Sequence, residues 1–105
     1  MKKKEILTHL EKWNSSMMEM EKQLEKLSEL FGSADDNSPF IKALCRIQEG
    51  YTDAVSDLLG CKGDWLRTWW LEWGFKGSVL NVEIDGVEFP AKTLEDLATI
   101  IEADR

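Results

Sequence analysis

The residue types that most often carry out chemistry in proteins are scarce in this sequence. Among 105 residues there is one histidine, His9, and there are two cysteines, Cys45 and Cys61. A metal site needs several such ligands at close spacing, and these three lie far apart along the chain. A nucleophile with an activating base would require His9 to lie beside one of the cysteines, and nothing in the pattern predicts this. The sequence therefore predicts no metal site and no catalytic cysteine.

Phosphate-binding loops and catalytic carboxylate pairs are not indicated either. Residues 60–63, Gly-Cys-Lys-Gly, lack the spacing of a phosphate-binding loop. Glu83 and Glu88 fall on the polar side of an alternating pattern, where solvated carboxylates are typical. We therefore expect no catalytic residue, no cofactor and no enzymatic activity. Only a deep pocket with converging polar groups would revive an enzyme hypothesis.

Length and composition indicate one globular domain. Hydrophobic residues make up 43% of the chain and charged residues 31%, and every uninterrupted apolar run is short. We expect no membrane-spanning segment, no signal peptide and a cytoplasmic location. A helix between Cys45 and Cys61 would hold them about 24 Å apart at ~1.5 Å per residue, too far for a disulfide. Both cysteines are therefore expected to be reduced thiols.

The net charge of −7 is unevenly distributed. Residues 1–33 contain six lysines and six glutamates, whereas residues 34–105 contain seven basic and fourteen acidic residues. An acidic surface repels phosphate backbones, so we expect no direct binding to nucleic acid. The same surface increases solubility and would suit a basic protein partner.

Two long helices are predicted in the first 60 residues, and a short link makes them an antiparallel hairpin. In the first, apolar residues recur at steps of four and three over about 40 Å: Ile6, Leu10, Trp13, Met17, Met20, Leu24, Leu27 and Phe31. Pro39 predicts the start of the second. Its apolar seam is Phe40, Leu44, Ile47, Tyr51, Ala54 and Leu58, broadened by Ile41, Val55 and Leu59. We expect Gly50, in the middle of this helix, to admit a bulky Met or Trp side chain of the first.

Residues 64–105 are predicted to form a second structural unit of the same domain. Asp64 is expected to cap a short helix that carries Trp65, Trp69, Trp70 and Trp73. A β-hairpin with a type I′ turn at Asp85-Gly86 follows. Its expected cross-strand pairs are Ile84 with Val87, Val82 with Phe89, and Leu80 with Ala91. Thr93-Leu94-Glu95-Asp96 resembles a capping box that starts a last helix. The predicted class is α+β and mostly α, with one domain over residues 1–105.

Two groups of residues are candidates for an interface. The first helix outruns the second, so its N-terminal part needs cover from the C-terminal unit or from a second chain. A homodimer through the helical hairpin, making a four-helix arrangement, is the expected assembly. In the Trp-rich helix most rings should be core, with Trp65 or Trp73 partly exposed. The candidate interface residues are Ile6, Leu7, Leu10, Trp13, Trp65 and Trp73.

Part of the chain resembles small proteins encoded in bacteriophage and prophage genomes. The likeness lies in Asp64-Trp65-Leu66, Trp70 and Gly74-Phe75, then in residues 82–86 (Val-Glu-Ile-Asp-Gly) and 93–97 (Thr-Leu-Glu-Asp-Leu). It implies a phage accessory protein acting inside a bacterial host cell, and it transfers no site residues. We expect a non-catalytic protein–protein interaction module. The alternative is an inhibitor or acidic nucleic-acid mimic that blocks a basic site on a host protein.

Overall fold

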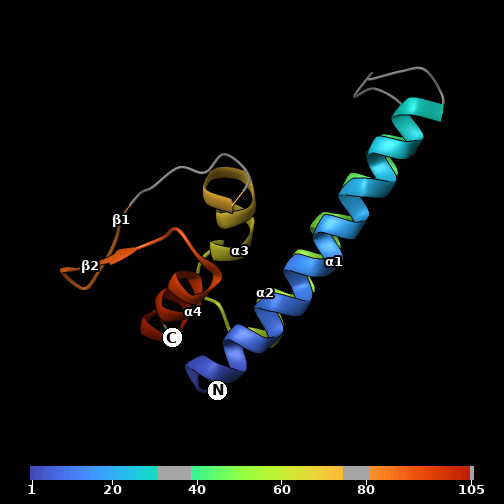
Figure 1. The fold of residues 1–105 in the computed structure, drawn as a ribbon. Coiled ribbons are helices and arrows are strands. Elements are labelled where there is room, and N and C mark those ends of the chain that lie inside the picture. The colour runs from blue at the N-terminus through green and yellow to red at the C-terminus, as the bar shows by residue number, and fades with distance from the viewer. Residues whose placement is uncertain (31–38, 75–80, 105) are drawn as a thin grey trace.

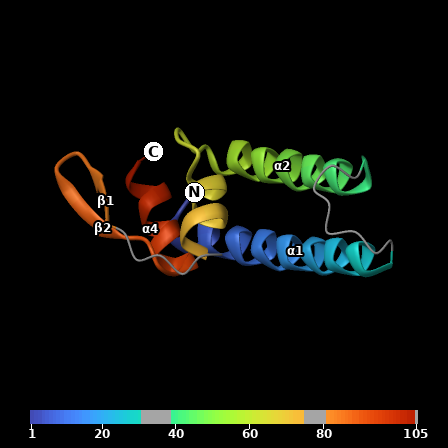
Figure 2. The same cartoon turned by 90° about the horizontal axis from the view of Figure 1, so that it is seen from above.

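The chain folds into a long helical hairpin with a smaller α/β unit packed beside one end of it (Figures 1 and 2). The structure is a computed structural model that describes residues 1–30, 39–74 and 81–104. Its elements are α1 Lys3–Leu30, α2 Pro39–Leu59, α3 Trp65–Thr68, the π-helix η1 Trp69–Gly74, β1 Asn81–Ile84, β2 Val87–Pro90 and α4 Leu94–Ala103. The molecule is elongated, with principal extents of 48 × 25 × 18 Å. The predicted mostly α, α+β class is confirmed.

The apolar seam predicted for the first helix is confirmed in α1. Five of its residues are buried: Ile6, Leu10, Trp13, Met17 and Leu24. Met20 and Leu27 are half-buried, and Phe31 lies outside the described residues. Because these side chains recur every three or four residues, they share one face of the helix and turn it towards the rest of the chain.

The second helix presents a different face from the one predicted. It starts at Pro39 and ends at Leu59, followed by Gly60 with a φ of 69°. Its buried residues are Gln48, Thr52 and Leu59, whereas three residues of the predicted seam are exposed: Ile47, Ala54 and Leu58. The prediction of a buried seam is therefore wrong at these three positions. Apolar residues occur on both sides of α2. The side that faces α1 is the one with Thr52, which accepts a hydrogen bond from Trp13 and donates one to Met17.

Gly50 does not receive a side chain of α1, so that expectation is wrong. A Cβ atom built on Gly50 would have no atom of the described residues within 4 Å. The residue is exposed, because the helix is rotated so that this position points away from α1.

The Trp-rich helix is split into one α-helical turn, α3, and a π-helix, η1. Asp64 precedes α3 but makes no capping hydrogen bond with its side chain, so the predicted cap is wrong. The wider turn of a π-helix shifts the direction of successive side chains. Both Trp69 and Trp70 contact the ring of Trp13 edge-on, with centroid separations of 6.1 and 6.2 Å.

The β-hairpin has the predicted turn and register. Asp85 and Gly86 have φ values of 51° and 80°, as a type I′ turn requires. Ile84 pairs with Val87 and Val82 with Phe89, as expected. The expected pair of Leu80 with Ala91 lies outside the described residues. Val82, Ile84 and Phe89 are half-buried against the core, while Val87, beside the turn, is exposed.

The last helix covers the N-terminal end of α1. It begins with the predicted capping box, in which the Thr93 hydroxyl accepts from the Asp96 backbone N–H and the Asp96 carboxylate accepts from that of Thr93. Its buried residues are Leu97, Ala98, Ile100 and Ile101. The backbone N–H of Lys3 in α1 donates to Glu102 Oε2 in α4 over 2.6 Å. The sequence left open whether the C-terminal unit or a second chain would cover this part of α1. In the structure, α4 of the C-terminal unit covers it.

Candidate functional site

The candidate interface residues of α1 contribute to the core of the chain. Ile6, Leu10 and Trp13 are completely buried, and Leu7 is half-buried against the same cluster. Ile6, Leu10 and Trp13 therefore stabilise the core and present no surface to a second chain in this conformation, whereas Leu7 retains part of its surface.

The two tryptophans singled out as partly exposed lie in different situations. Trp65 is half-buried, and its Nε1–H donates to Asp104 Oδ2 at the end of α4 over 2.7 Å. This bond ties the start of α3 to the C-terminal helix. The side chain of Trp73 lies outside the part of the chain that the structure describes.

A hydrogen-bonded cluster joins three elements at the centre of the molecule. The Nε1–H of the buried Trp13 donates to Thr52 Oγ1 over 3.1 Å. The Thr52 hydroxyl in turn donates to Met17 Sδ over 3.6 Å. Since Trp13 also contacts Trp69 and Trp70, this cluster connects α1, α2 and η1. Sequence reasoning overlooked Thr52, although Gln48 and Thr52 at a spacing of four mark a polar pair among apolar residues of α2.

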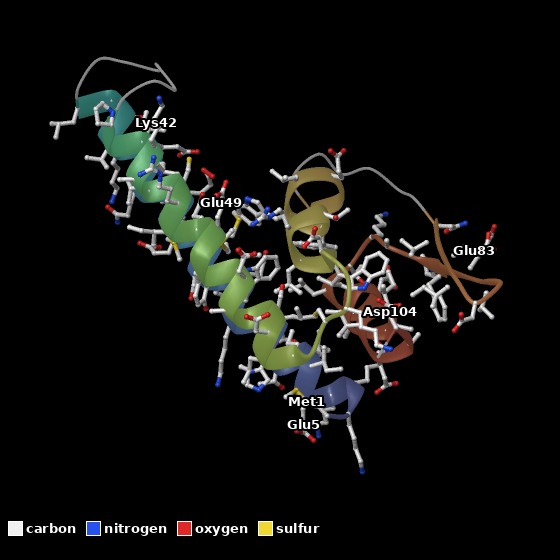
Figure 3. All side chains as sticks on the ribbon, turned by 180° about the vertical axis from the view of Figure 1, so that it is seen from behind. Met1, Glu5, Lys42, Glu49, Glu83 and Asp104 are labelled. Carbon is white, nitrogen blue, oxygen red and sulfur yellow. The ribbon has the colours of Figure 1, made fainter. Side chains whose placement is uncertain are left out.

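The face of α2 that points away from the core carries an exposed apolar stripe. We call Ala43, Ile47, Gly50, Ala54 and Leu58 the outer stripe, because steps of four and three place them on one side of the helix. The side chain of Ile47 is 55% exposed and that of Leu58 is 59% exposed. In Figure 3 α2 runs in front of α1, and no other described element lies in front of it.

One margin of the outer stripe is charged. Arg46, Asp53 and Asp57 follow one another at steps of seven and four and are all exposed. Asp53 already accepts from Arg67 of α3, with an Nη2–Oδ1 distance of 3.1 Å. Arg46 and Asp57 have no ion-pair partner among residues 1–30, 39–74 and 81–104. The two unpaired charges have opposite sign and lie towards opposite ends of the stripe.

A pocket of about 230 Å³ lies on another side of α2, where α1, α2, α3 and η1 meet. Its lining is apolar at Met17, Trp70 and Leu71, and it also includes Glu21, Cys45, Gln48, Glu49, Thr52 and Arg67. Gln48 is only 7% exposed, and its Nε2 has no hydrogen-bond partner among the described residues. The same is true of Trp69 Nε1.

The pocket does not bring together a nucleophile and a histidine base, since His9 is not among its lining residues. Cys45, which lines it, and Cys61 both carry thiols, as predicted. Within the described ranges there is no group of three or more His, Cys, Asp or Glu side chains placed to hold a metal ion. None of the helices described is both long enough and apolar enough to cross a membrane.

Comparison of the chain with protein-family models, with curated proteins and with solved structures found no match.

Proposed function

We propose that this protein is a non-catalytic interaction module that forms a homodimer through the outer stripe of α2. The observation that supports this most directly is the exposure of Ile47 and Leu58, each more than half open to solvent on one helical face. Exposed apolar side chains gathered on one face are typical of protein–protein contact surfaces. A two-fold symmetric contact requires only one such surface, because each copy supplies the same one.

Gly50 supports a close approach of two α2 helices at this stripe. A glycine inside a helix costs about 1 kcal/mol relative to alanine. No atom of the described residues occupies the space beside it, so packing within the chain gives no reason for it. At a helix crossing, a residue without a side chain lets the two backbones come close together.

The charged margin favours an antiparallel pair with Gly50 at the two-fold axis. In that arrangement Ile47 lies beside the partner's Ala54, and the two charged margins adjoin. Arg46 then lies level with Ala54 of the partner subunit, and the partner's Asp57 is about 4.5 Å further along at ~1.5 Å per residue. The Arg46 side chain can span that offset and form an ion pair. Two such pairs arise by symmetry.

A parallel pair would lack this complementarity. The two-fold axis would then run along the helices and would place each charged margin against the uncharged margin of the partner, which contains Leu44 and Tyr51. Charge therefore favours the antiparallel orientation. An antiparallel contact between two α2 helices also brings two helical hairpins together, as in the four-helix arrangement expected from the sequence.

We further propose that the protein acts inside a bacterial host cell, and this proposal rests on the phage resemblance alone.

The first test is the oligomeric state of the full chain. Sedimentation equilibrium over a wide concentration range should show a monomer–dimer equilibrium. Ile47→Asp should weaken the dimer at least about tenfold, because it buries an unpaired charge in the interface. Met18→Asp is the matched control, since Met18 is a 48% exposed apolar residue of α1 outside the stripe. A wild-type chain that stays monomeric throughout, or equal losses in both variants, would contradict the proposal.

The second test addresses the orientation. Arg46→Glu alone and Asp57→Arg alone should each weaken the homodimer, because like charges then face each other. An equimolar mixture of the two variants should restore dimerisation as a heterodimer, since both contacts again join opposite charges. If the wild type is dimeric but the mixture of the two variants does not dimerise, the antiparallel register is refuted. The outer stripe would then still be the contact surface.

A further inference from the structure

The β-hairpin is a sheet of two strands, so each strand has an outer edge. A two-residue turn makes the pair beside it, Ile84 with Val87, a hydrogen-bonded pair. In an antiparallel ladder such pairs alternate with pairs whose backbone groups point away from the other strand. The backbone N–H and C=O groups of Asn81 and Glu83 therefore point outward from β1. These groups have no hydrogen-bond partner among the described residues.

The outer edge of β2 is less suited to pairing with a further strand. Its outward backbone groups belong to Glu88 and Pro90, and proline has no N–H to donate. The edge of β1 offers both a donor and an acceptor at Asn81 and at Glu83, which is the pattern that an added strand uses. A sheet of two strands is also marginal by itself and gains stability from a third. The edge at which this sheet can be extended is therefore that of β1.

The polar face of the hairpin selects the charge of the added strand. Glu83 and Glu88 lie directly opposite each other, and both are exposed. Neither forms an ion pair with a described residue. In Figure 3 the side chain of Glu83 projects outward from the hairpin. Like charges directly opposite each other destabilise a strand pair, so a lysine or arginine on a neighbouring strand, placed beside Glu83, would relieve the repulsion.

We propose that β1 binds an extended segment of another protein, in which basic and apolar residues alternate, as an added antiparallel strand. The basic residues lie opposite Asn81 and Glu83, and their backbone N–H and C=O groups pair with those of β1. The apolar residue between them lies on the other face, beside the half-buried Val82. A second copy of β1 is less suitable, since it would bring another glutamate to the same face.

This edge is separate from the outer stripe of the proposed dimer. The hairpin packs against α4, whereas the outer stripe belongs to α2. Ile47→Asp should therefore bind the added strand like the wild type. A failure of the dimer and a failure of the β1 edge can thus be distinguished.

The probe is a short peptide with blocked ends in which lysine alternates with valine. In NMR spectra of the ¹⁵N-labelled full chain, it should shift the backbone amide signals of Asn81 and Glu83, with a Kd on the order of millimolar. Hydrogen exchange at both amides should be fast in the free protein and at least about tenfold slower when the peptide is bound. The same peptide with glutamate in place of lysine should bind at least about tenfold more weakly.

Two methylated forms of the lysine–valine peptide test the register. Methyl groups on the backbone nitrogens of the lysines should abolish binding, because these nitrogens face β1. Methyl groups on the backbone nitrogens of the valines should leave binding unchanged, because those nitrogens face away from β1.

Glu83→Lys tests the contribution of charge. It should weaken binding of the lysine–valine peptide at least about tenfold and strengthen binding of the glutamate–valine peptide. Glu25→Lys, at an exposed position of α1, is the matched control, because it changes the net charge equally. It should bind both peptides like the wild type.

Two results would overturn the proposal. One is slow hydrogen exchange at Asn81 and Glu83 without peptide, which would mean that this chain or a second copy of it already covers the edge. The other is equal binding of the lysine and glutamate peptides to the wild-type chain, or the absence of saturable shifts with either. These measurements need no mutation, so they decide the question even if Glu83→Lys fails to fold.

Discussion

Trp13 and Thr52, which are 39 positions apart in the sequence, are joined by a buried hydrogen bond in which the Trp13 Nε1–H donates to Thr52 Oγ1 over 3.1 Å. The bond lies on the side of α2 that faces α1. Once Thr52 points inward, Gln48 lies beside the pocket and Ile47 and Leu58 point outward. The outer stripe and the pocket therefore lie on different sides of α2 in the orientation that includes this contact.

Loss of the Thr52 hydroxyl should be strongly destabilising. Thr52→Val keeps the shape of the side chain but leaves the Trp13 N–H buried and unpaired, which should lower the free energy of unfolding by about 1–3 kcal/mol. Urea denaturation measures the change. Thr52→Ser keeps the hydroxyl and is the control, with an expected loss of only the small methyl contribution, about 1 kcal/mol or less. Equal stability of Thr52→Val and the wild type would show that the bond is unimportant.

Replacing Gln48 should have the opposite effect on stability. Gln48→Met removes a buried amide that lacks a partner within the described chain, so the free energy of unfolding should rise by about 1–2 kcal/mol. Chemical denaturation measures this, and Gln23→Met, at an exposed position of α1, should change the value by less than about 0.5 kcal/mol. A more stable variant would confirm that the Gln48 amide N–H lacks a partner in the folded chain. A destabilised variant would instead indicate that Gln48 is satisfied in the free protein.

Gly50→Ala should separate the stability of the helix from that of the dimer. Because the added methyl group meets no atom of the described chain within 4 Å, the monomer should gain about 0.5–1 kcal/mol from the better helix former. The same methyl group would separate the two helices at the proposed crossing, so the dimer should dissociate more readily. Unfolding at low concentration and sedimentation equilibrium measure the two effects. An unchanged dimer with a stabilised monomer would place the crossing away from Gly50.

Asp96 should make the stability depend on pH in the acid range. Burial by itself would raise the pKa of Asp96, but the backbone N–H groups of Lys92 and Thr93, the Thr93 hydroxyl and the charge of Lys3 together hold that pKa below 3.8. Since the pKa is lower in the folded than in the unfolded state, the ionised carboxylate stabilises the fold above about pH 4. This contribution is lost as the pH falls through the folded-state pKa.

The Asp96→Asn variant measures that contribution. At neutral pH it should be less stable than the wild type by roughly 0.5–1 kcal/mol, as expected for a carboxylate in the first turn of a helix. The difference between the two proteins should shrink as the pH is lowered from about 5 through the folded-state pKa of Asp96, because the aspartate then becomes protonated as well. A difference that stays constant over this range would contradict an ionic contribution from Asp96.

Short-range features of this protein could be predicted from the sequence. The seam of α1, the type I′ turn at Asp85-Gly86, the pairs that follow from it and the Thr93–Asp96 capping box all agree with the structure. Each depends on residues within one or two turns of one another, or directly opposite across a tight turn. Their geometry is set by backbone dihedral angles and local hydrogen bonds, which the residue types specify directly.

Long-range choices required the tertiary structure. The residues of α2 form two apolar sides, one with Leu44, Val55 and Leu59 and one with Ile47 and Leu58. The periodicity of the sequence does not show which of the two sides is buried. In the structure, the side with Leu59 and Thr52 packs against α1 and includes the bond between Trp13 and Thr52, and α4 covers the start of α1. Local sequence determined which segments become helices and where the hairpin turns. Which faces meet, and hence which remain available for a partner or a ligand, was decided by burial and hydrogen bonding between residues far apart in the chain.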